Sequence, residues 1–339
     1  MDGRVRDPVR PQHHRPAQDL SLCRSRFAAV AALLAAAALT TGCGDDSAES
    51  VTPRGQPTPS GTLGIAVAGR PDTLDPLLAT SPADRLTAAQ IYEPLSRAVT
   101  PPYGQGTSQP GLALWTRPGA GGTIWRIRLR SGVRFTDGAR FNATAVLQNA
   151  MRWRTTAEGQ ALLPGLVAAD APRPDLVRLI FDRPAENAMH ALASARLGVV
   201  SPRALRSPAA SSRLAAGLAA GTGPFELHRR ADREMLLARN SEWWGTRHQL
   251  GPGVELIALR SPQAAGRRLA LLGDGTVQVA EGLGPEELAA VEQDPLLTSR
   301  RGPGDAGVGL SRAVRGLPTG SGTPVLSSVW LTGVGSGEG

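Results

Sequence analysis

The chain has 339 residues, of which 41% are hydrophobic and 4% aromatic, and it carries a formal net charge of +8 at pH 7. All 37 basic residues are arginine, so chemistries that need a lysine, such as a Schiff base or the lysine of a phosphate-binding loop, are excluded. The arginines are scattered and aromatic residues are few. This composition argues against nucleic-acid binding, because such surfaces combine a basic groove with stacking aromatic side chains.

The N-terminus has the pattern of a bacterial export signal. Arg24 and Arg26 precede an apolar run over 27–39, which is shorter than the roughly 20 residues that a membrane-spanning helix needs. The run continues into Leu39-Thr40-Thr41-Gly42-Cys43, which resembles the lipobox of bacterial lipoproteins. We therefore expect residues 1–42 to be a signal peptide and Cys43 to be lipidated, which would hold the protein on the outer face of the cytoplasmic membrane.

Removal of this leader changes the composition of the mature chain. Residues 1–42 carry six arginines and three aspartates, so the formal charge falls from +8 to +5. Cys43 is then the one remaining cysteine, and the sequence predicts no internal disulfide. Residues 43–60 are rich in Ser, Pro, Gly and Thr and have few apolar side chains, which is typical of a flexible tether.

Strand and helix patterns alternate along the body of the chain, as in α/β folds. Residues 125–130 alternate apolar and arginine side chains, the period of a half-buried strand with a solvated arginine face of Arg126, Arg128 and Arg130. Asp137-Gly138 is a turn dipeptide that places Phe135 and Phe141 in the core. The predicted strands are 61–67, 125–129, 176–181 and 324–331, and the predicted helices are 84–95, 143–153, one from Pro184, one from Ser261-Pro262 to Gly273, and 285–293.

The sequence contains no constellation typical of catalysis or metal binding. His190, His228 and His248 are isolated from one another and lack ligand spacing. Asp72 and Asp75 lie in a proline-bounded turn, where aspartate is favoured for local hydrogen bonding. We therefore expect no enzyme activity, no catalytic residue, no metal and no cofactor.

Eight segments occur in the order seen in family 5 extracellular solute-binding proteins, the dipeptide, oligopeptide and nickel-binding group that serves ABC importers. The chain resembles this family most visibly over Trp125–Gly138, with Phe141 beyond it. The resemblance implies an α/β, periplasmic-binding-protein-like (type II) bilobal architecture. The other matching segments are 72–76, 91–95, 110–113, 200–205, 221–225, 240–245 and 270–277.

The resemblance also implies a function. Such a protein binds peptides or another small solute outside the membrane and delivers them to an ABC transporter permease. The segment Gly221-Thr222-Gly223-Pro224-Phe225 suits a crossing or hinge near the cleft, since its glycines permit unusual backbone angles and its proline fixes one. Loops at such junctions often line ligand sites, so we predict ligand contacts from Thr222, Gly223, Pro224 and Phe225.

The C-terminal part departs from the family pattern. We predict a first lobe over 61–255, a crossover and the start of a second lobe over 256–301, and a Gly/Ser/Pro-rich segment over 302–339. The second lobe is expected to be incomplete. Two alternatives therefore stay open, namely a non-transport surface lipoprotein that retains the first lobe as a protein-interaction module, or a truncated remnant.

Overall fold

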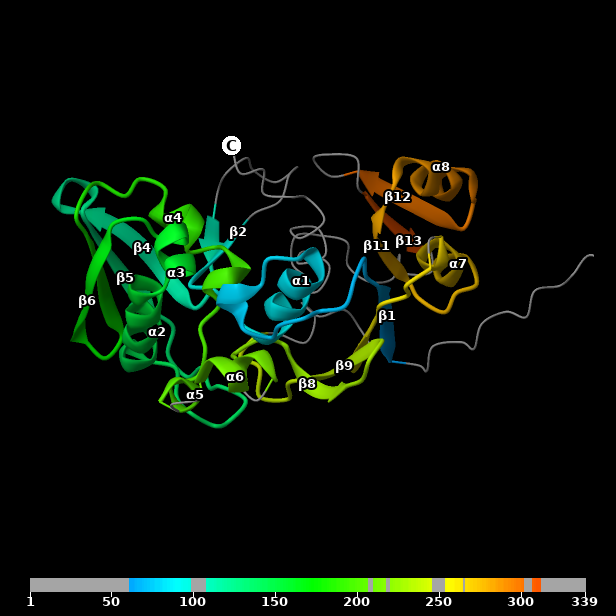
Figure 1. The fold of residues 1–339 in the computed structure, drawn as a ribbon. Coiled ribbons are helices and arrows are strands. Elements are labelled where there is room, and N and C mark those ends of the chain that lie inside the picture. The colour runs from blue at the N-terminus through cyan, green and yellow to red at the C-terminus, as the bar shows by residue number, and fades with distance from the viewer. Residues whose placement is uncertain are drawn as a thin grey trace, which may run out of the picture. The chain divides into compact units, whose positions relative to one another are not determined.

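The computed structural model describes residues 61–98, 108–206, 210–217, 220–245, 254–264, 266–301 and 307–311 (Figure 1). All of them belong to one unit of the chain, residues 52–339. Cys43, the signal peptide, the tether and the strand predicted at 324–331 lie outside the described residues. Within the described residues, helices alternate with strands that form three sheets, which confirms the predicted α/β class.

β1 (Thr62–Ala66) lies inside a seven-stranded sheet with the order β12-β13-β11-β1-β10-β9-β8. It pairs in parallel with β10 (Leu256–Arg260) on one side and β11 (Val279–Leu283) on the other, and the remaining pairs of this sheet are antiparallel. β1 has a neighbouring strand at each edge and packed side chains on both faces, so it is buried. Its side chains are accordingly almost all apolar. The strands at the two flanks are β8 (Phe225–Arg230), β9 (Glu234–Arg239), β12 (Leu297–Arg301) and β13 (Gly307–Ser311).

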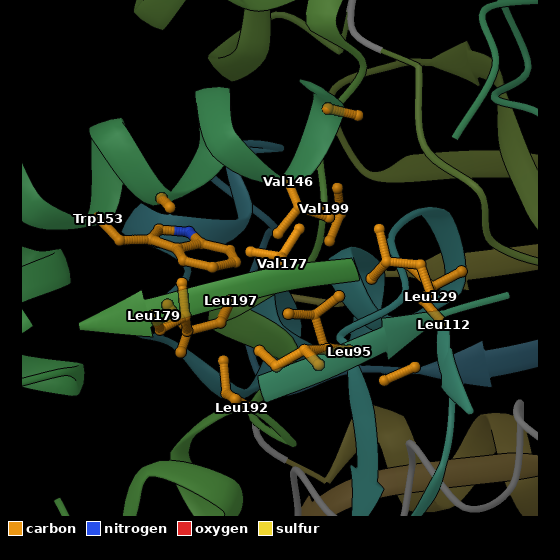
Figure 2. Close-up of a cluster of buried hydrophobic side chains, with 14 of the residues drawn as sticks. Leu95, Leu112, Leu129, Val146, Trp153, Val177, Leu179, Leu192, Leu197 and Val199 are labelled. Carbon is orange, nitrogen blue, oxygen red and sulfur yellow. The ribbon is translucent and has the colours of Figure 1, made fainter. Parts of the chain in front are cut away.

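A four-stranded antiparallel sheet with the order β4-β5-β7-β6 has its own apolar cluster. Figure 2 shows this cluster, in which Val146 and Trp153 of α2 (Ala143–Thr155) face Val177 and Leu179 of β7. The alternating side chains predicted for 125–129 are buried on the apolar side, as expected of a half-buried strand. The strands are β4 (Ala113–Gly119), β5 (Ile124–Leu129), β6 (Leu166–Arg173) and β7 (Leu176–Phe181), and β2 (Ser96–Ala98) pairs with β3 (Ser108–Pro110) in a third, two-stranded sheet.

Side chains at the helix starts satisfy backbone donors that have no partner within the helix. In α1 (Pro82–Ile91) the Ser81 hydroxyl accepts from the Asp84 amide at 3.0 Å, and Asn142 accepts from Ala145 at 3.2 Å at the start of α2. At α8 (Pro285–Gln293) the Glu287 carboxylate accepts from the Gly284 amide at 2.9 Å. The remaining helices are α3 (Ala157–Leu162), α4 (Ala188–Ala191), α5 (Pro202–Leu205), α6 (Ala210–Ala215), α7 (Arg267–Gly273) and the short 3-10 turns Pro76–Leu78, Ala120–Gly122 and Ala195–Leu197.

The structure confirms several local predictions. The helix predicted at 285–293 has the same bounds as α8, and the strands predicted at 125–129 and 176–181 correspond to β5 and β7. Gly138 has a φ of 79° in the predicted turn. Phe135 and Phe141 on either side of that turn are buried and pack edge to face, with ring centroids 6.3 Å apart.

The helix predicted at 84–95 begins and ends earlier in the structure. Ser81 and Pro82 supply an N-cap and a first-turn proline, so α1 starts at Pro82. It ends at Ile91 because Tyr92 is extended and Pro94 restricts the backbone of the residue before it. Leu95 is buried beyond the helix end rather than on its apolar face.

The helix predicted from Pro184 is wrong in its start, since α4 begins only at Ala188. The backbone between these residues instead forms hydrogen bonds with parts of the chain that are distant in the sequence. The Ala185 amide donates to the Gly122 carbonyl at 3.1 Å, and the Trp125 indole donates to the Ala185 carbonyl at 3.1 Å. These contacts hold the segment against β5 and its preceding turn.

The helix predicted from Ser261-Pro262 is also wrong in its start, although its stop at Gly273 is confirmed. α7 begins at Arg267, and Ser261 does not cap it. The Ser261 hydroxyl donates to the Gly69 carbonyl at 3.1 Å, while its amide donates to the Arg233 carbonyl at 3.0 Å. Ser261 therefore forms hydrogen bonds to residues that are distant in the sequence and does not cap a helix.

Candidate functional site

The segment Gly221–Phe225 lies against the C-terminal end of α1. The Gly223 amide donates to the Ile91 carbonyl at 2.9 Å. A Cβ atom on Gly221 would lie 1.9 Å from the Ile91 carbonyl oxygen, and one on Gly223 would lie 2.4 Å from the Gln90 carbonyl oxygen. Both contacts are with backbone, so no larger side chain fits at either position.

The four residues predicted to contact ligand are all buried in this structure. Phe225 belongs to the apolar cluster around β1, and the Asn240 side chain fixes the turn by donating to the Gly223 carbonyl at 2.8 Å. The Asn240 amide also donates to the Pro224 carbonyl at 2.8 Å. Direct ligand contact by Thr222, Gly223, Pro224 and Phe225 stays a prediction. The Thr222 hydroxyl lies beside the Glu93 carboxylate, which is the centre of a polar cluster.

Glu93 is the acidic centre of that cluster. It follows α1 in the chain and is only 5% exposed. Its carboxylate accepts from the Trp244 indole at 2.6 Å and from the Arg97 guanidinium at 2.8 Å. Burial raises the pKa of Glu93, and the nearby Arg97 charge, the Trp244 indole and the Thr222 hydroxyl oppose that rise.

Two arginines lie over the ring of Trp244. The Arg130 guanidinium carbon is 4.2 Å from the ring centroid and that of Arg97 is 5.2 Å from it. Arg130 also donates from Nε to the Gly111 carbonyl at 3.3 Å. Burial lowers the pKa of Arg130, the neighbouring Arg97 lowers it further, and Glu93 raises it. We call Glu93, Arg97, Arg130 and Trp244 the Glu93 cluster.

The solvated arginine face predicted beside β5 is therefore only partly correct. Arg126 is exposed, and Arg128 forms an ion pair with Asp175 at 2.7 Å. Arg130, just beyond the strand, is instead half-buried against Trp244. The indole rings of Trp243 and Trp244 lie with their centroids 6.0 Å apart, and Trp244 packs against two apolar clusters.

Asp75 has the local hydrogen-bonding role predicted for aspartate in this turn, whereas the bond shown at Asp72 is made by its backbone amide. The Asp75 carboxylate accepts from the Leu77 amide at 3.1 Å and forms an ion pair with Arg152 of α2. The amide of Asp72 donates to the Asp84 carboxylate at 2.7 Å. Among the described residues, no group of three His, Cys, Asp or Glu side chains is arranged to hold a metal ion.

The family resemblance identified the segments that contain Glu93, Arg130 and Trp244, but it did not predict that these side chains lie close together. Glu93, Arg130 and Trp244 each lie in a segment on which the family resemblance rests. Arg97 lies outside these segments, and no sequence signal identified it. A polar residue inside an otherwise apolar motif, such as Glu93 within Ile91–Leu95, was the available clue.

The fold and the comparisons define the class of protein. The sequence matches the family described as "Bacterial extracellular solute-binding proteins, family 5 Middle" over residues 75–318, and the chain belongs to this family. The fold is that of type II periplasmic binding proteins, as predicted. No curated protein matches the chain. In the part of the chain that the structure describes, no helix has the length and apolar character needed to cross a membrane.

Solved structures share this fold at low sequence identity. The binding protein AgaA from A. tumefaciens R10, in complex with agropinic acid, is 19% identical with a TM-score of 0.63, over 72% of this chain and 48% of its own. DppA from Helicobacter pylori, in complex with the peptide STSA, is 20% identical with a TM-score of 0.61, over 72% and 51%. NikZ from Campylobacter jejuni, in complex with Ni(L-His), is 17% identical with a TM-score of 0.62, over 72% and 48%. The chain thus spans about half the length of these structures.

Proposed function

We propose that this protein is the solute-binding lipoprotein of an ABC importer, which binds a peptide or a related small solute outside the membrane and delivers it to a permease. Its family consists of extracellular solute-binding proteins rather than enzymes. Relatives of the same fold were solved with a peptide and with agropinic acid. These ligands support a solute that carries a carboxylate.

The observation that carries the proposal is the charge and geometry of the Glu93 cluster. The cluster contains two guanidinium groups and one carboxylate, so its formal net charge is +1. Glu93 is almost fully buried and fixes the Arg97 guanidinium and the Trp244 indole, whereas the Arg97 side chain is 29% exposed. An arginine held in place by a buried partner binds a carboxylate with less loss of side-chain entropy. We assign the solute carboxylate to Arg97 and Arg130.

The test is thermal unfolding of the full chain with a mixed pool of short peptides, compared with the same pool bearing amidated C-termini. A ligand at 100 times its dissociation constant adds about 2.7 kcal/mol to the stability of the native state. We expect the free-acid pool to raise the unfolding midpoint and the amidated pool to have little effect. Equal shifts with both pools would contradict the carboxylate assignment, and no shift with either would contradict peptide binding.

The lipid anchor forms a separate part of the proposal. We expect Cys43→Ser to abolish labelling by a fatty-acid analogue and to release the protein from the membrane fraction. Stable anchoring needs two acyl chains or an equivalent second signal, because one chain binds only marginally. Ser47→Ala, in the predicted tether, is the matched control and should leave labelling intact. Membrane retention of the Cys43→Ser protein at the wild-type level would overturn the lipoprotein assignment.

A further inference from the structure

The outer face of the four-stranded sheet carries a row of arginine side chains. Residues that lie directly opposite each other on paired strands point to the same face of a sheet. Arg117 of β4 is opposite Arg126 of β5, which is opposite Arg178 of β7, and Arg178 is opposite Asp170 of β6. The strand register thus brings side by side arginines that belong to three different strands.

The two neighbouring rows of this face add further charge and some apolar surface. In one row, Trp115 of β4 is opposite Arg128 of β5, and Arg173 of β6 continues the row. In the other row, Ile124 and Ile180 are opposite each other and half-buried. We call the five arginines of this surface the basic face, namely Arg117, Arg126, Arg128, Arg173 and Arg178.

The basic face points away from the apolar interior. Figure 2 shows side chains of α2 packed on the other face of the sheet, against Val177 and Leu179 of β7. Arg178 lies between these two residues in the strand and therefore projects to the opposite side. The Arg178 side chain is 38% exposed, and Arg117 and Arg126 are exposed as well. These guanidinium groups are therefore accessible from solvent.

Carboxylates neutralise only part of the basic face. Asp170 forms an ion pair with Arg178. Asp175 lies 2.7 Å from the Arg128 guanidinium and 3.6 Å from that of Arg173. Five guanidinium groups and these two carboxylates give the surface a formal net charge of +3.

Arg117 and Arg126 form no ion pair within the part of the chain that the structure describes. The Arg117 guanidinium carbon lies 4.9 Å from the centroid of the Trp115 ring. The Arg126 guanidinium lies against Gly119, where a Cβ atom would collide with it. Like charges directly opposite each other destabilise a sheet, so an anion bound beside these two arginines would relieve their repulsion.

We propose that the basic face docks on the headgroups of anionic phospholipids at a membrane surface. Arginine suits headgroup phosphates because its planar donors match their oxygen pairs. Trp115 and the half-buried isoleucine row suit the boundary between headgroups and acyl chains, where tryptophan is enriched. This docking goes beyond the proposed solute binding, because the basic face shares no residue with the Glu93 cluster.

The lipid anchor proposed at Cys43 would keep a membrane within reach of this face. The predicted tether over 43–60 has 18 residues, and a chain of this length has an end-to-end distance of roughly 25 Å. The folded part would therefore stay close to the lipid surface. At such distances each arginine near an anionic surface raises the affinity about fivefold.

The test is co-sedimentation of the full chain with lipid vesicles. One kind of vesicle contains phosphatidylcholine alone, and the other contains equal parts of phosphatidylcholine and phosphatidylglycerol. Every sample carries Cys43→Ser, so no acyl chain contributes and the leader is common to all. We expect stronger partition into the anionic vesicles, weakening as salt rises. Arg126→Gln should lower this partition about fivefold, and Arg117→Gln combined with Arg126→Gln about twentyfold.

Arg154→Gln is the matched control. Arg154 is exposed near the end of α2, the helix that covers the opposite face of the sheet, and its replacement removes the same charge. We expect it to leave the partition within about twofold, because charges beyond a Debye length of about 10 Å are largely screened. Equal losses with Arg126→Gln and Arg154→Gln would show general electrostatic attraction and overturn the proposal.

Protein-free vesicles also distinguish a lipid surface from a membrane protein as the partner. Equal partition of the folded Cys43→Ser protein into neutral and anionic vesicles would overturn lipid docking. Binding to bacterial membranes that is lost when their proteins are digested, without charge-dependent binding to protein-free vesicles, would assign the face to a protein partner and overturn it too.

Discussion

Glu93 joins parts of the protein that are distant in the sequence. It binds Arg97 four residues away and Trp244 from the segment after β9, while Thr222 of the buried turn lies close enough to affect its pKa. A buried carboxylate is costly unless it is paired and hydrogen-bonded. Arg97 and Trp244 offset part of that cost and lower the pKa of Glu93, but burial raises the pKa by more than they lower it.

The raised pKa of Glu93 gives stability a defined pH dependence. The folded protein holds the Glu93 proton more tightly than the unfolded chain, whose carboxyl has the ordinary value of 4.5. The stability due to this proton is therefore full below pH 4.5 and is lost as the pH rises through the folded-state pKa. We expect the free energy of unfolding of the wild type, relative to Glu93→Gln, to fall between pH 4.5 and neutral pH.

Urea unfolding of both proteins at several pH values measures this difference. Asp175→Asn is a matched control, because Asp175 is a half-exposed surface carboxylate in an ion pair with Arg128. Its stability difference from wild type should not show the same fall over this range. Parallel stability curves for wild type and Glu93→Gln would refute the assigned pKa direction.

Gly223 is a second residue whose role follows from its surroundings. Gly223→Ala would place a Cβ atom 2.4 Å from the Gln90 carbonyl oxygen and 2.6 Å from that of Ile91. Neither backbone can move without disturbing the end of α1, so we expect a loss of about 1–3 kcal/mol in the free energy of unfolding. Gly273→Ala is the control, because a Cβ atom there would meet no atom of the described residues within 4 Å, and alanine is the better helix former. Comparable losses in the two variants would contradict the close-approach argument.

At the scale of elements, α1 depends on its first turn. Ser81 accepts from the Asp84 amide, and Asp84 in turn accepts from the Ser81 amide at 3.4 Å. Ser81→Ala removes the first bond, and we expect it to lower the free energy of unfolding by about 1 kcal/mol. Thr80→Ala, one residue earlier at an exposed position, should change it far less. Chemical denaturation of the two variants checks this, and equal effects would show that the cap contributes nothing specific.

The predictable elements are those whose ends are set by local chemistry. α8 could be predicted in full, because Pro285 and two acidic residues in its first turn act within a few residues. The starts of α4 and α7 could not, because Ala185 and Ser261 bond to Gly122 and Gly69 from elsewhere in the chain. Propensity and capping patterns contain no information about such partners.

The same limit applies to the candidate site. The sequence indicated that the segments around Glu93, Arg130 and Trp244 matter, but not that they meet. Their contact requires the α1 end, the β5 end and the segment after β9 to be placed by two separate sheets. Arg97 was missed because it lies in a short strand with no distinctive pattern. The buried positions of Thr222 and Phe225 depend on the close backbone approach at Gly221 and Gly223, which composition alone cannot predict.

On the scale of the whole molecule, the buried apolar side chains of the residues that the structure describes form three clusters. One surrounds β1 and β10, one lies between the four-stranded sheet and α2, and a smaller one lies beneath α7 and α8. Trp244 packs against the first two clusters. The Glu93 cluster therefore lies where two cores meet, and a solute bound there would stabilise both.

The position of each strand in the seven-stranded sheet sets its expected protection from hydrogen exchange. β1 has a hydrogen-bonded neighbour on each side and buried side chains, so its amides at Ile65 and Ala66 should exchange only through global unfolding. β12 lies at one end of the sheet order and pairs with β13 alone among the described strands. Its amides should exchange through local fraying at much smaller free energies. Hydrogen exchange followed by mass spectrometry measures both, and equal protection of the two strands would mean that β12 has a further partner.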